Sequence, residues 1–270
     1  MLQSQKLLIK RILYLILLYQ LCRIGFYIYN YSNFGQVGIK EFLGGIRFDL
    51  SAIFFTNALL IILHTLPGNF KYNKKYQKVL AYLFVGVNLL FLATNFIDFE
   101  YYNFTDKRST VSLITASGMK GDVMRLMPIF LQKYWYLAII FIIFVIFFRY
   151  TYPKDSIKNE EKSGSNRKNI LIEIGIFLVS IGLIVLAGRG GFQRATIKVV
   201  DAINYTHNPK NTAIVLNTPF TILKTLGKKE VISHKPEVVS EEEFLTIDEI
   251  RDYIKKFNHI YSVNITLVEK

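Results

Sequence analysis

The organisation of this chain follows from one apolar run, ILIEIGIFLVSIGLIVLA at residues 170–187. The run is followed at once by a glycine-rich stretch, GRGGF at residues 188–192. A helix rises about 1.5 Å per residue, so this apolar run is long enough to cross a hydrocarbon core. The glycines behind it let the backbone leave helical geometry at the far interface. The sequence before the run is typical of membrane-embedded segments. The sequence after it is typical of water-exposed chain. The sequence therefore predicts a membrane module that presents a tail on one side.

The distribution of apolar residues supports this interpretation. They make up 51% of the chain and gather into runs near the length of a bilayer crossing, whereas a soluble fold would scatter them at helix or strand period. The net charge of +13 could suggest nucleic acid as a partner. Much of the Lys and Arg lies in short loops beside the apolar runs, however, where it sets orientation and anchors to anionic headgroups. We expect membrane lipids as partners and no nucleic acid.

We predict an all-α membrane protein with five transmembrane helices in residues 1–188. The second begins after Gly44 and Gly45 and stops at Pro67, which gives it a glycine start and a proline stop. Aromatic residues fall at the ends of several runs, as in an aromatic belt. The predicted spans are about 7–29, 46–66, 79–99, 134–150 and 170–187.

The loops predict the orientation. The loop between the second and third spans carries Lys71, Lys74, Lys75 and Lys78 and no acid, and the loop between the fourth and fifth also has more bases than acids. Both loops and the N-terminus should therefore be cytoplasmic. With an odd number of spans, the C-terminus then lies outside. The basic N-terminal run has no small-residue cleavage site behind it, so we expect an uncleaved signal anchor.

Two outer segments follow from this topology. Residues 100–133 form a long loop in which 123–131 is a candidate amphipathic helix, serving as a cover, a docking platform or an ordered connection. After the last span we expect a mostly helical juxtamembrane segment at 189–227 and a linker at 228–270. In that linker Ser240 and Glu243 form a capping box ahead of an amphipathic helix, and residues 261–267 alternate as a strand does.

Residues that carry chemistry are sparse. The sequence has no nucleophile elbow, no zinc spacing and no phosphate-binding glycine loop, and its four histidines are dispersed. Cys22 is the single cysteine, so no intramolecular disulfide is possible. We identify no complete active site, no catalytic residue and no metal ligands, and whether the chain is an enzyme stays open on this ground.

Ionisable residues at the predicted span ends are the remaining candidates, because charges at membrane depth are costly. In the predicted topology they lie near the outer surface, and Arg23 lies near that level too. One hypothesis is a ring that binds headgroups or docks a domain, with arginines on phosphate oxygens and acids fixing them. The alternative is that each is a helix-end anchor or pairs with a neighbour. The candidates are Arg47, Asp49, Asp98, Glu100, Arg189 and Arg194.

Four short motifs carry a family resemblance. They are GIRFDLS at 45–51, DFEYY at 98–102 with KRS at 107–109, GGFQ at 190–193, and NTPF at 217–220. In their order and placement relative to the spans, they resemble the membrane half of the lipoteichoic acid synthase family and its phosphoglycerol transferase relatives. The resemblance implies an extracytoplasmic sulfatase-like α/β domain with a Thr or Ser nucleophile and a divalent metal such as Mn, Mg or Zn. That domain would transfer phosphoglycerol or phosphoethanolamine, or hydrolyse an ester.

The catalytic residues of that family match no position here, so the resemblance implies no cofactor in this chain. We expect it to be the N-terminal membrane part of such an enzyme in the bacterial cytoplasmic (inner) membrane, inactive alone. A non-enzymatic membrane interaction or scaffold protein is the alternative. A small transporter is the third possibility, and the lack of a convincing internal repeat argues against it.

Overall fold

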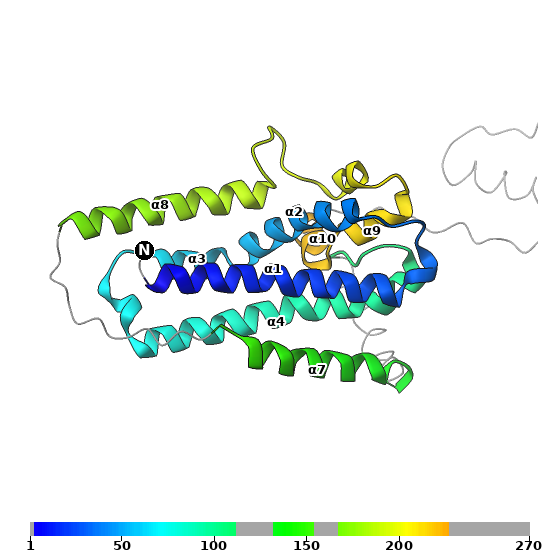
Figure 1. The fold of residues 1–270 in the computed structure, drawn as a ribbon, viewed down its shortest axis with the longest axis horizontal. Helices are drawn as coiled ribbons and strands as arrows, with labels where there is room; N and C mark the ends of the chain where they lie inside the picture. Colours follow the sequence, from blue (N-terminus) through cyan, green and yellow to red (C-terminus); the bar gives the residue numbers. More distant parts are fainter. Residues whose placement is uncertain (1–2, 112–131, 154–166, 227–270) are drawn as a thin grey trace, which may run out of the picture. The chain divides into compact units, whose positions relative to one another are not determined.

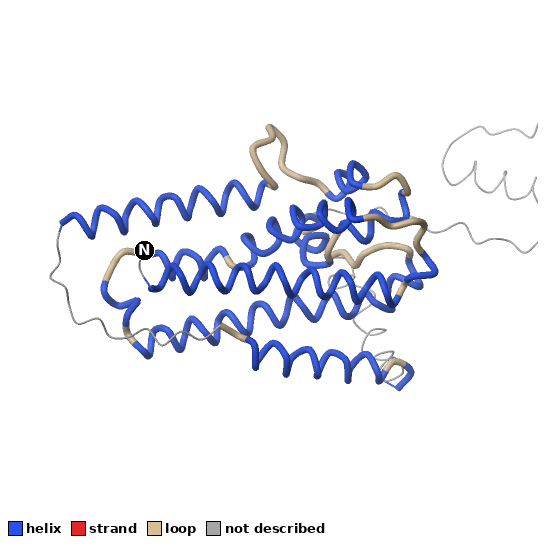
Figure 2. Tube along the Cα trace, viewed as in Figure 1, coloured by secondary structure: helices blue, strands red, loops and turns tan. Residues whose placement is uncertain are grey.

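The computed structural model describes residues 3–111, 132–153 and 167–226, and within these ranges the chain is helical and has no strand (Figure 2). The sequence prediction of an all-α protein is confirmed for this part. The candidate helix at 123–131, the amphipathic helix expected after the capping box at Ser240 and the strand at 261–267 lie outside the described residues.

The principal helices agree with the five apolar runs of the sequence (Figure 1). They are α1 (Gln3–Tyr29), α2 (Ile39–Thr56), α3 (Ala58–Thr65), α4 (Lys74–Thr105), α7 (Trp135–Thr151) and α8 (Arg167–Arg189). After α8 come η3 (Val199–Tyr205), η4 (Pro209–Asn211), α9 (Thr212–Val215) and α10 (Thr218–Thr225), and the short turns η1 (Tyr31–Asn33) and η2 (Asn69–Tyr72) lie in earlier loops.

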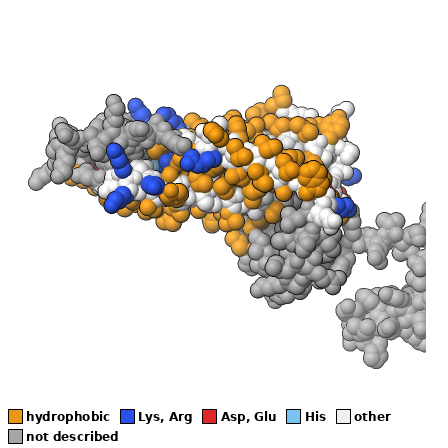
Figure 3. Space-filling model, turned by 90° about the horizontal axis from the view of Figure 1, so that it is seen from below, with side chains coloured by type: hydrophobic (Ala, Val, Ile, Leu, Met, Phe, Trp, Pro, Cys, Tyr) orange, Lys and Arg blue, Asp and Glu red, His pale blue; other side chains and the backbone are white. Residues whose placement is uncertain are grey.

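Apolar residues cover both the inner and the outer faces of these helices. On α1, Leu15, Leu18 and Phe26 are fully buried, while Leu13 and Ile28 on the other side are 60% and 68% exposed. The most apolar stretch of α8 has no buried residue at all. A helix that is apolar all round suits a membrane, where lipid takes the place of water on its outer face. In Figure 3, hydrophobic side chains cover much of the face shown, and Lys and Arg gather mainly toward the end where Figure 1 places the N-terminus.

Three of the described helices are long and apolar enough to cross a membrane: Ser4–Tyr29, Lys74–Thr105 and Ile170–Arg189. The pair Ile39–Thr56 and Ala58–Thr65 makes a fourth if it counts as one span, and Trp135–Thr151 is apolar but shorter. The structure thus has three to four helices that qualify as candidate spans, compared with the five spans predicted from the sequence. Helix packing joins them, since α1 contacts α2, α3 and α4, while α8 contacts α2 and α3 and α7 contacts α4.

The second predicted span differs from the straight helix expected over 46–66. It begins at Ile39 and bends by 65° between α2 and α3. At the break the Asn57 side chain donates to the Ile53 carbonyl (3.0 Å) and exchanges two hydrogen bonds with the buried Asn88 amide of α4 (3.0 and 2.8 Å). The Asn57 backbone N–H donates to the same Ile53 carbonyl (2.9 Å), so the amide adds a side-chain contact at the residue that caps the end of α2.

The glycine-rich exit of α8 has the predicted role. Gly190 and Gly191 have positive φ values of 83° and 122°. Their N–H groups donate to the carbonyls of Ala187 (2.8 Å) and Leu186 (2.9 Å), the hydrogen-bond pattern of a Schellman cap. A Cβ on Gly190 would also lie 2.5 Å from the Ile197 side chain. Glycine at this position therefore ends the helix and lets the following chain turn back.

The chain after α8 corrects one expectation. Residues 190–226 are mostly helical, as predicted, but they are not simply water-exposed chain. α9 contacts α1 and α2, and α10 contacts α2 and α4 (Figure 1). The residues between Ala213 and Ile222 are all buried. This post-span segment, residues 190–226, folds back into the helices, and polar contacts explain why.

Candidate functional site

A buried ion pair joins α1 to α2. The two guanidinium ends of Arg23 donate to the two carboxylate oxygens of Asp49, each at 2.6 Å, and neither side chain is more than 1% exposed. Gln20 donates a further hydrogen bond to Asp49 at 2.7 Å. Bidentate pairing fixes both the distance and the rotation of the two groups. The carboxylate therefore has a defined orientation inside the protein.

The remaining donors of Arg23 reach the post-span segment. Its Nε donates to the Ile214 carbonyl (2.7 Å), and one terminal nitrogen donates to the carbonyls of Val215 and Gly45 (both 3.2 Å). A Cβ on Gly45 would lie 2.3 Å from the Arg23 Cζ, so glycine leaves the space that the guanidinium occupies. Arg23 thereby donates to carbonyl groups near the end of α9. The last carbonyls of a helix have no N–H partner within the helix itself, so they need one from elsewhere.

A second buried acid, Asp98 of α4, lies in a similar arrangement. It accepts hydrogen bonds from the Ser109 backbone N–H (3.0 Å), the Ser109 hydroxyl and the Thr218 hydroxyl (2.5 Å). Arg108 lies 3.6 Å away and donates from Nε to the Ala213 carbonyl (2.8 Å). Its guanidinium carbon also lies 3.4 Å from the centre of the Phe26 ring. Burial lowers the pKa of Arg108, and the neighbouring Asp98 opposes that shift.

Asn217 and Thr218 connect the two acids. The Asn217 amide donates to Asp49 (2.8 Å) while its oxygen caps α10 by accepting from the Phe220 N–H (2.8 Å). The next residue, Thr218, reaches Asp98. The Phe220 ring then packs edge-on against Phe48, with centroids 5.0 Å apart. We define the docking site as Arg23, Asp49, Asp98, Arg108, Asn217 and Thr218.

Arg47 holds the start of the post-span segment. Its Nε donates to the Gly190 carbonyl (2.6 Å), and its other nitrogens donate to the Tyr205 hydroxyl (2.8 Å) and to the Gln193 side chain. One turn along α2, the Ser51 hydroxyl donates to the Gly188 carbonyl (2.8 Å). α2 therefore holds the segment at its beginning as well as at α9 and α10.

The six candidate residues do not form one paired ring. Asp49 and Asp98 belong to the docking site, with Arg23 and Arg108 as their cationic partners, and Arg47 binds the glycine exit. Glu100 is half-buried elsewhere on α4 and accepts from the Tyr29 hydroxyl (2.7 Å). The side chains of Arg189 and Arg194 are exposed, and Arg189 donates to the Arg194 backbone carbonyl (2.6 Å).

Four members of the docking site were not among those candidates. Arg23 was placed near the same level in the sequence analysis, and the other three were Arg108, Asn217 and Thr218. Arg108 lies in the loop after the predicted third span rather than at a span end, and Asn217 and Thr218 are neutral residues that a search for charges passes over. Each nevertheless lies in a motif that carries the resemblance, KRS at 107–109 and NTPF at 217–220. The signal available in the sequence was thus the joint occurrence of these motifs, since no single residue type marks the site.

The chemistry of the docking site favours holding over reacting. Each of its two acids already accepts hydrogen bonds from several donors, so both carboxylates are committed to structural contacts. Removing one partner of a buried pair destabilises a protein by about 3–5 kcal/mol, because the other charge is left uncompensated. The arrangement therefore fixes the post-span segment in one register against α1, α2 and α4.

No known protein family, curated protein or solved structure matches this chain.

Proposed function

We propose that this chain is the membrane-embedded part of a lipoteichoic-acid-synthase-like enzyme and holds an extracytoplasmic sulfatase-like catalytic module at the outer face of the bacterial cytoplasmic membrane. The observation that carries the proposal is the docking site. Residues of three of the four motifs, those at 45–51, 98–109 and 217–220, meet there, although they are far apart in the sequence. Their convergence supports treating the motifs as one functional unit.

A rigid connection has a clear purpose in such an enzyme. A catalytic module that acts on lipid-linked or envelope substrates must stay at a set height above the bilayer. The buried contacts of Asn217 and Thr218 fix the backbone just before residue 226, where the chain leaves the described helices. The docking site would therefore set the point from which that module is presented.

The proposed topology keeps five spans, with the N-terminus inside and the post-span segment outside. α7 counts as the fourth span in this proposal. At about 1.5 Å per residue its Trp135–Thr151 helix is somewhat shorter than a typical hydrocarbon core, and local thinning of the bilayer can accommodate a short span. The gathering of Lys and Arg toward one end of the face in Figure 3 fits a cytoplasmic side there.

Anionic headgroups are the proposed lipid partners at the outer face. Arg189 and Arg194 follow the last span and have exposed side chains, which places them where phosphate oxygens at the interface can be reached. Asp49 and Asp98 have a different part in the proposal, because they hold the post-span segment. The role of headgroup contact thus falls to these two arginines, while Arg47 holds the glycine exit.

The function is tested in cells from which the coding region of this chain has been deleted. We expect the content of phosphoglycerol or phosphoethanolamine esters in the envelope to fall. Putting the wild-type coding region back at its own locus should restore that content. Asp49→Asn should restore it poorly, whereas Glu100→Gln, a matched change at an acid outside the docking site, should restore it fully. Unchanged levels of both esters after deletion would refute the proposal.

Topology is measured separately. Alkaline phosphatase fused after Lys235 should be active and β-galactosidase at the same position inactive. The reverse pattern would place the tail in the cytosol and remove the catalytic module from its proposed substrate.

A further inference from the structure

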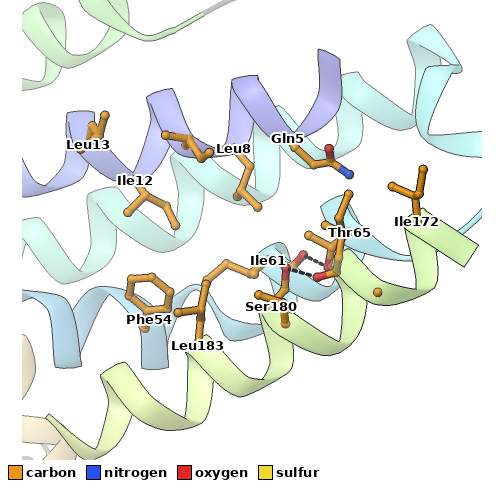
Figure 4. A pocket seen from close by; sticks show the side chains of 14 residues that line it. Gln5, Leu8, Ile12, Leu13, Phe54, Ile61, Thr65, Ile172, Ser180 and Leu183 are labelled. Carbon is orange, nitrogen blue, oxygen red and sulfur yellow. Dashed lines mark hydrogen bonds between the residues drawn. The ribbon is translucent and has the colours of Figure 1, made fainter. Parts of the chain in front are cut away.

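A cavity of about 530 Å³ lies between α1, α3 and α8, with Phe54 of α2 at one end (Figure 4). Leu8 and Ile12 line it from α1, Ile61 from α3, and Ile176 and Leu183 from α8. Its volume lies within the range of roughly 300–1,000 Å³ that small-molecule sites occupy. It is separate from the docking site, with which it shares no residue.

The polar residues of the wall do little to change its apolar character. The Thr65 hydroxyl donates to the Ile61 carbonyl and the Ser180 hydroxyl to the Ile176 carbonyl, each at 2.8 Å (Figure 4). Both hydroxyls are therefore turned to the backbone of their own helices. Gln5 is the third polar residue and lies toward the N-terminal end of α1. The occupant thus meets a mainly hydrocarbon surface.

The cavity opens where apolar residues are exposed. Leu13 on α1 and Val179 on α8 line it and are 60% and 62% exposed. Both helices belong to the candidate membrane spans. In the bilayer of the proposed topology, such an opening faces lipid tails. Its length is also suitable, because the α8 lining from Ile172 to Leu183 extends about 16 Å at 1.5 Å per residue.

We infer that this cavity, which we call the lipid groove, binds one acyl chain of a membrane phospholipid as a resident structural ligand. The occupant has to be apolar, elongated and available at the depth of the spans, and an acyl chain meets all three conditions. The inference rests on the membrane insertion contained in the proposed function. It is independent of the catalytic module and of the headgroup contacts proposed for the arginines.

Gly175 provides a sharp test. It lines the groove, and a Cβ added there would meet no atom within 4 Å, so this position has room for the first atom of a side chain. Gly182 on the same helix has equally open surroundings but does not line the groove. Gly175→Phe and Gly182→Phe therefore form a matched pair.

The experiment uses the full chain in nanodiscs that contain phosphatidylglycerol with a photoactivatable diazirine on one acyl chain. After illumination, mass spectrometry locates the labelled residues. We expect label on Leu8 or Ile61, which are only 6% and 2% exposed and lie out of reach of lipid that merely surrounds the protein. Gly175→Phe should lower this label at least about fivefold by filling the groove, and Gly182→Phe should leave it within about twofold of wild type.

Equal labelling of Leu8 and Ile61 in wild type and Gly175→Phe would overturn the inference, as would label confined to outward residues. Should Gly175→Phe fail to fold, Gly175→Leu is measured in its place. A second copy of the chain in the groove would instead show itself as disulfide-linked dimers of Leu13→Cys in a Cys22→Ala background, and it too would overturn the inference. A chain that does not enter the nanodisc contradicts the proposed function as well, so the two failures are distinguishable.

Discussion

Asp49→Asn should release the post-span segment, because it leaves the Arg23 guanidinium buried without its counter-charge. The pair is at most 1% exposed, and Asp49 also accepts from Gln20 and Asn217. Losing one partner of such a pair costs about 3–5 kcal/mol. Since about 1.4 kcal/mol is a tenfold change in an equilibrium constant, undocking should become roughly two to four orders of magnitude more frequent.

A cysteine reporter measures this undocking. Val215 is fully buried beside Arg23, so Val215→Cys in a Cys22→Ala background reacts with a maleimide only when the segment opens. In nanodiscs both faces of the membrane are accessible, so the labelling rate does not depend on topology. When opening and closing are fast relative to labelling, the rate follows the open population. Asp49→Asn should raise the rate by those two to four orders of magnitude, up to the rate of a free thiol.

Glu100→Gln is the control, since it changes an acid of α4 that lies outside the docking site. Its effect on docking should stay within about 0.5 kcal/mol, or roughly twofold in labelling rate, because Glu100 contacts Tyr29 rather than the docking site and the glutamine oxygen can still accept from the Tyr29 hydroxyl. If Asp49→Asn labels at the wild-type rate, the ion pair does not hold the segment and the reasoning fails. Equal acceleration by both variants would show that any lost acid loosens the protein.

Three further predictions concern single contacts. Thr218→Val removes a hydroxyl from a buried carboxylate and should raise the same labelling rate by about ten- to a hundredfold, since hydrogen bonds to charged groups contribute about 1.5–3 kcal/mol; an unchanged rate would count against the second acid. Gly45→Ala puts a Cβ against the buried Arg23 guanidinium and should destabilise the purified protein by about 1–3 kcal/mol in thermal unfolding, whereas Gly86→Ala, with open space around it, should be neutral or stabilising. Equal effects of the two substitutions would contradict the close approach of Gly45 and Arg23. Asn57→Leu should lower the unfolding temperature because it leaves a buried donor of the Asn88 amide without a partner, and adding Asn88→Leu should recover part of the loss. A double variant as destabilised as the sum of the two single variants would argue against the amide pair.

The helices were predictable because an apolar run of bilayer length has few alternatives to a helix. The structure has a helix at each of the five predicted runs, with ends that differ by a few residues in most cases. The glycine exit at 190–191 was also predictable, since positive φ values belong mainly to glycine. The bend at Asn57 was not, because it depends on an amide partner on α4 that is remote in sequence.

The candidate site was predictable only in part. The cost of charge at membrane depth drew attention to Asp49 and Asp98, which the structure shows buried. It could not identify their partners, since pairing depends on how α1, α2 and the post-span segment meet. The expectation of a wholly water-exposed tail failed for the same reason. α10 is short, and its burial follows from contacts of Asn217 and Thr218 that local sequence does not reveal.

The central claim is that the post-span segment lies against α2 inside the membrane module, and photo-cross-linking from Phe220 tests it most directly. Phe220 packs on Phe48 with ring centroids 5.0 Å apart, so a benzophenone amino acid placed at position 220 should cross-link within the same chain to residues 39–56 in native membranes. Asp49→Asn should abolish that product. Cross-links that reach only lipid or other proteins, with none to α2, would contradict the account.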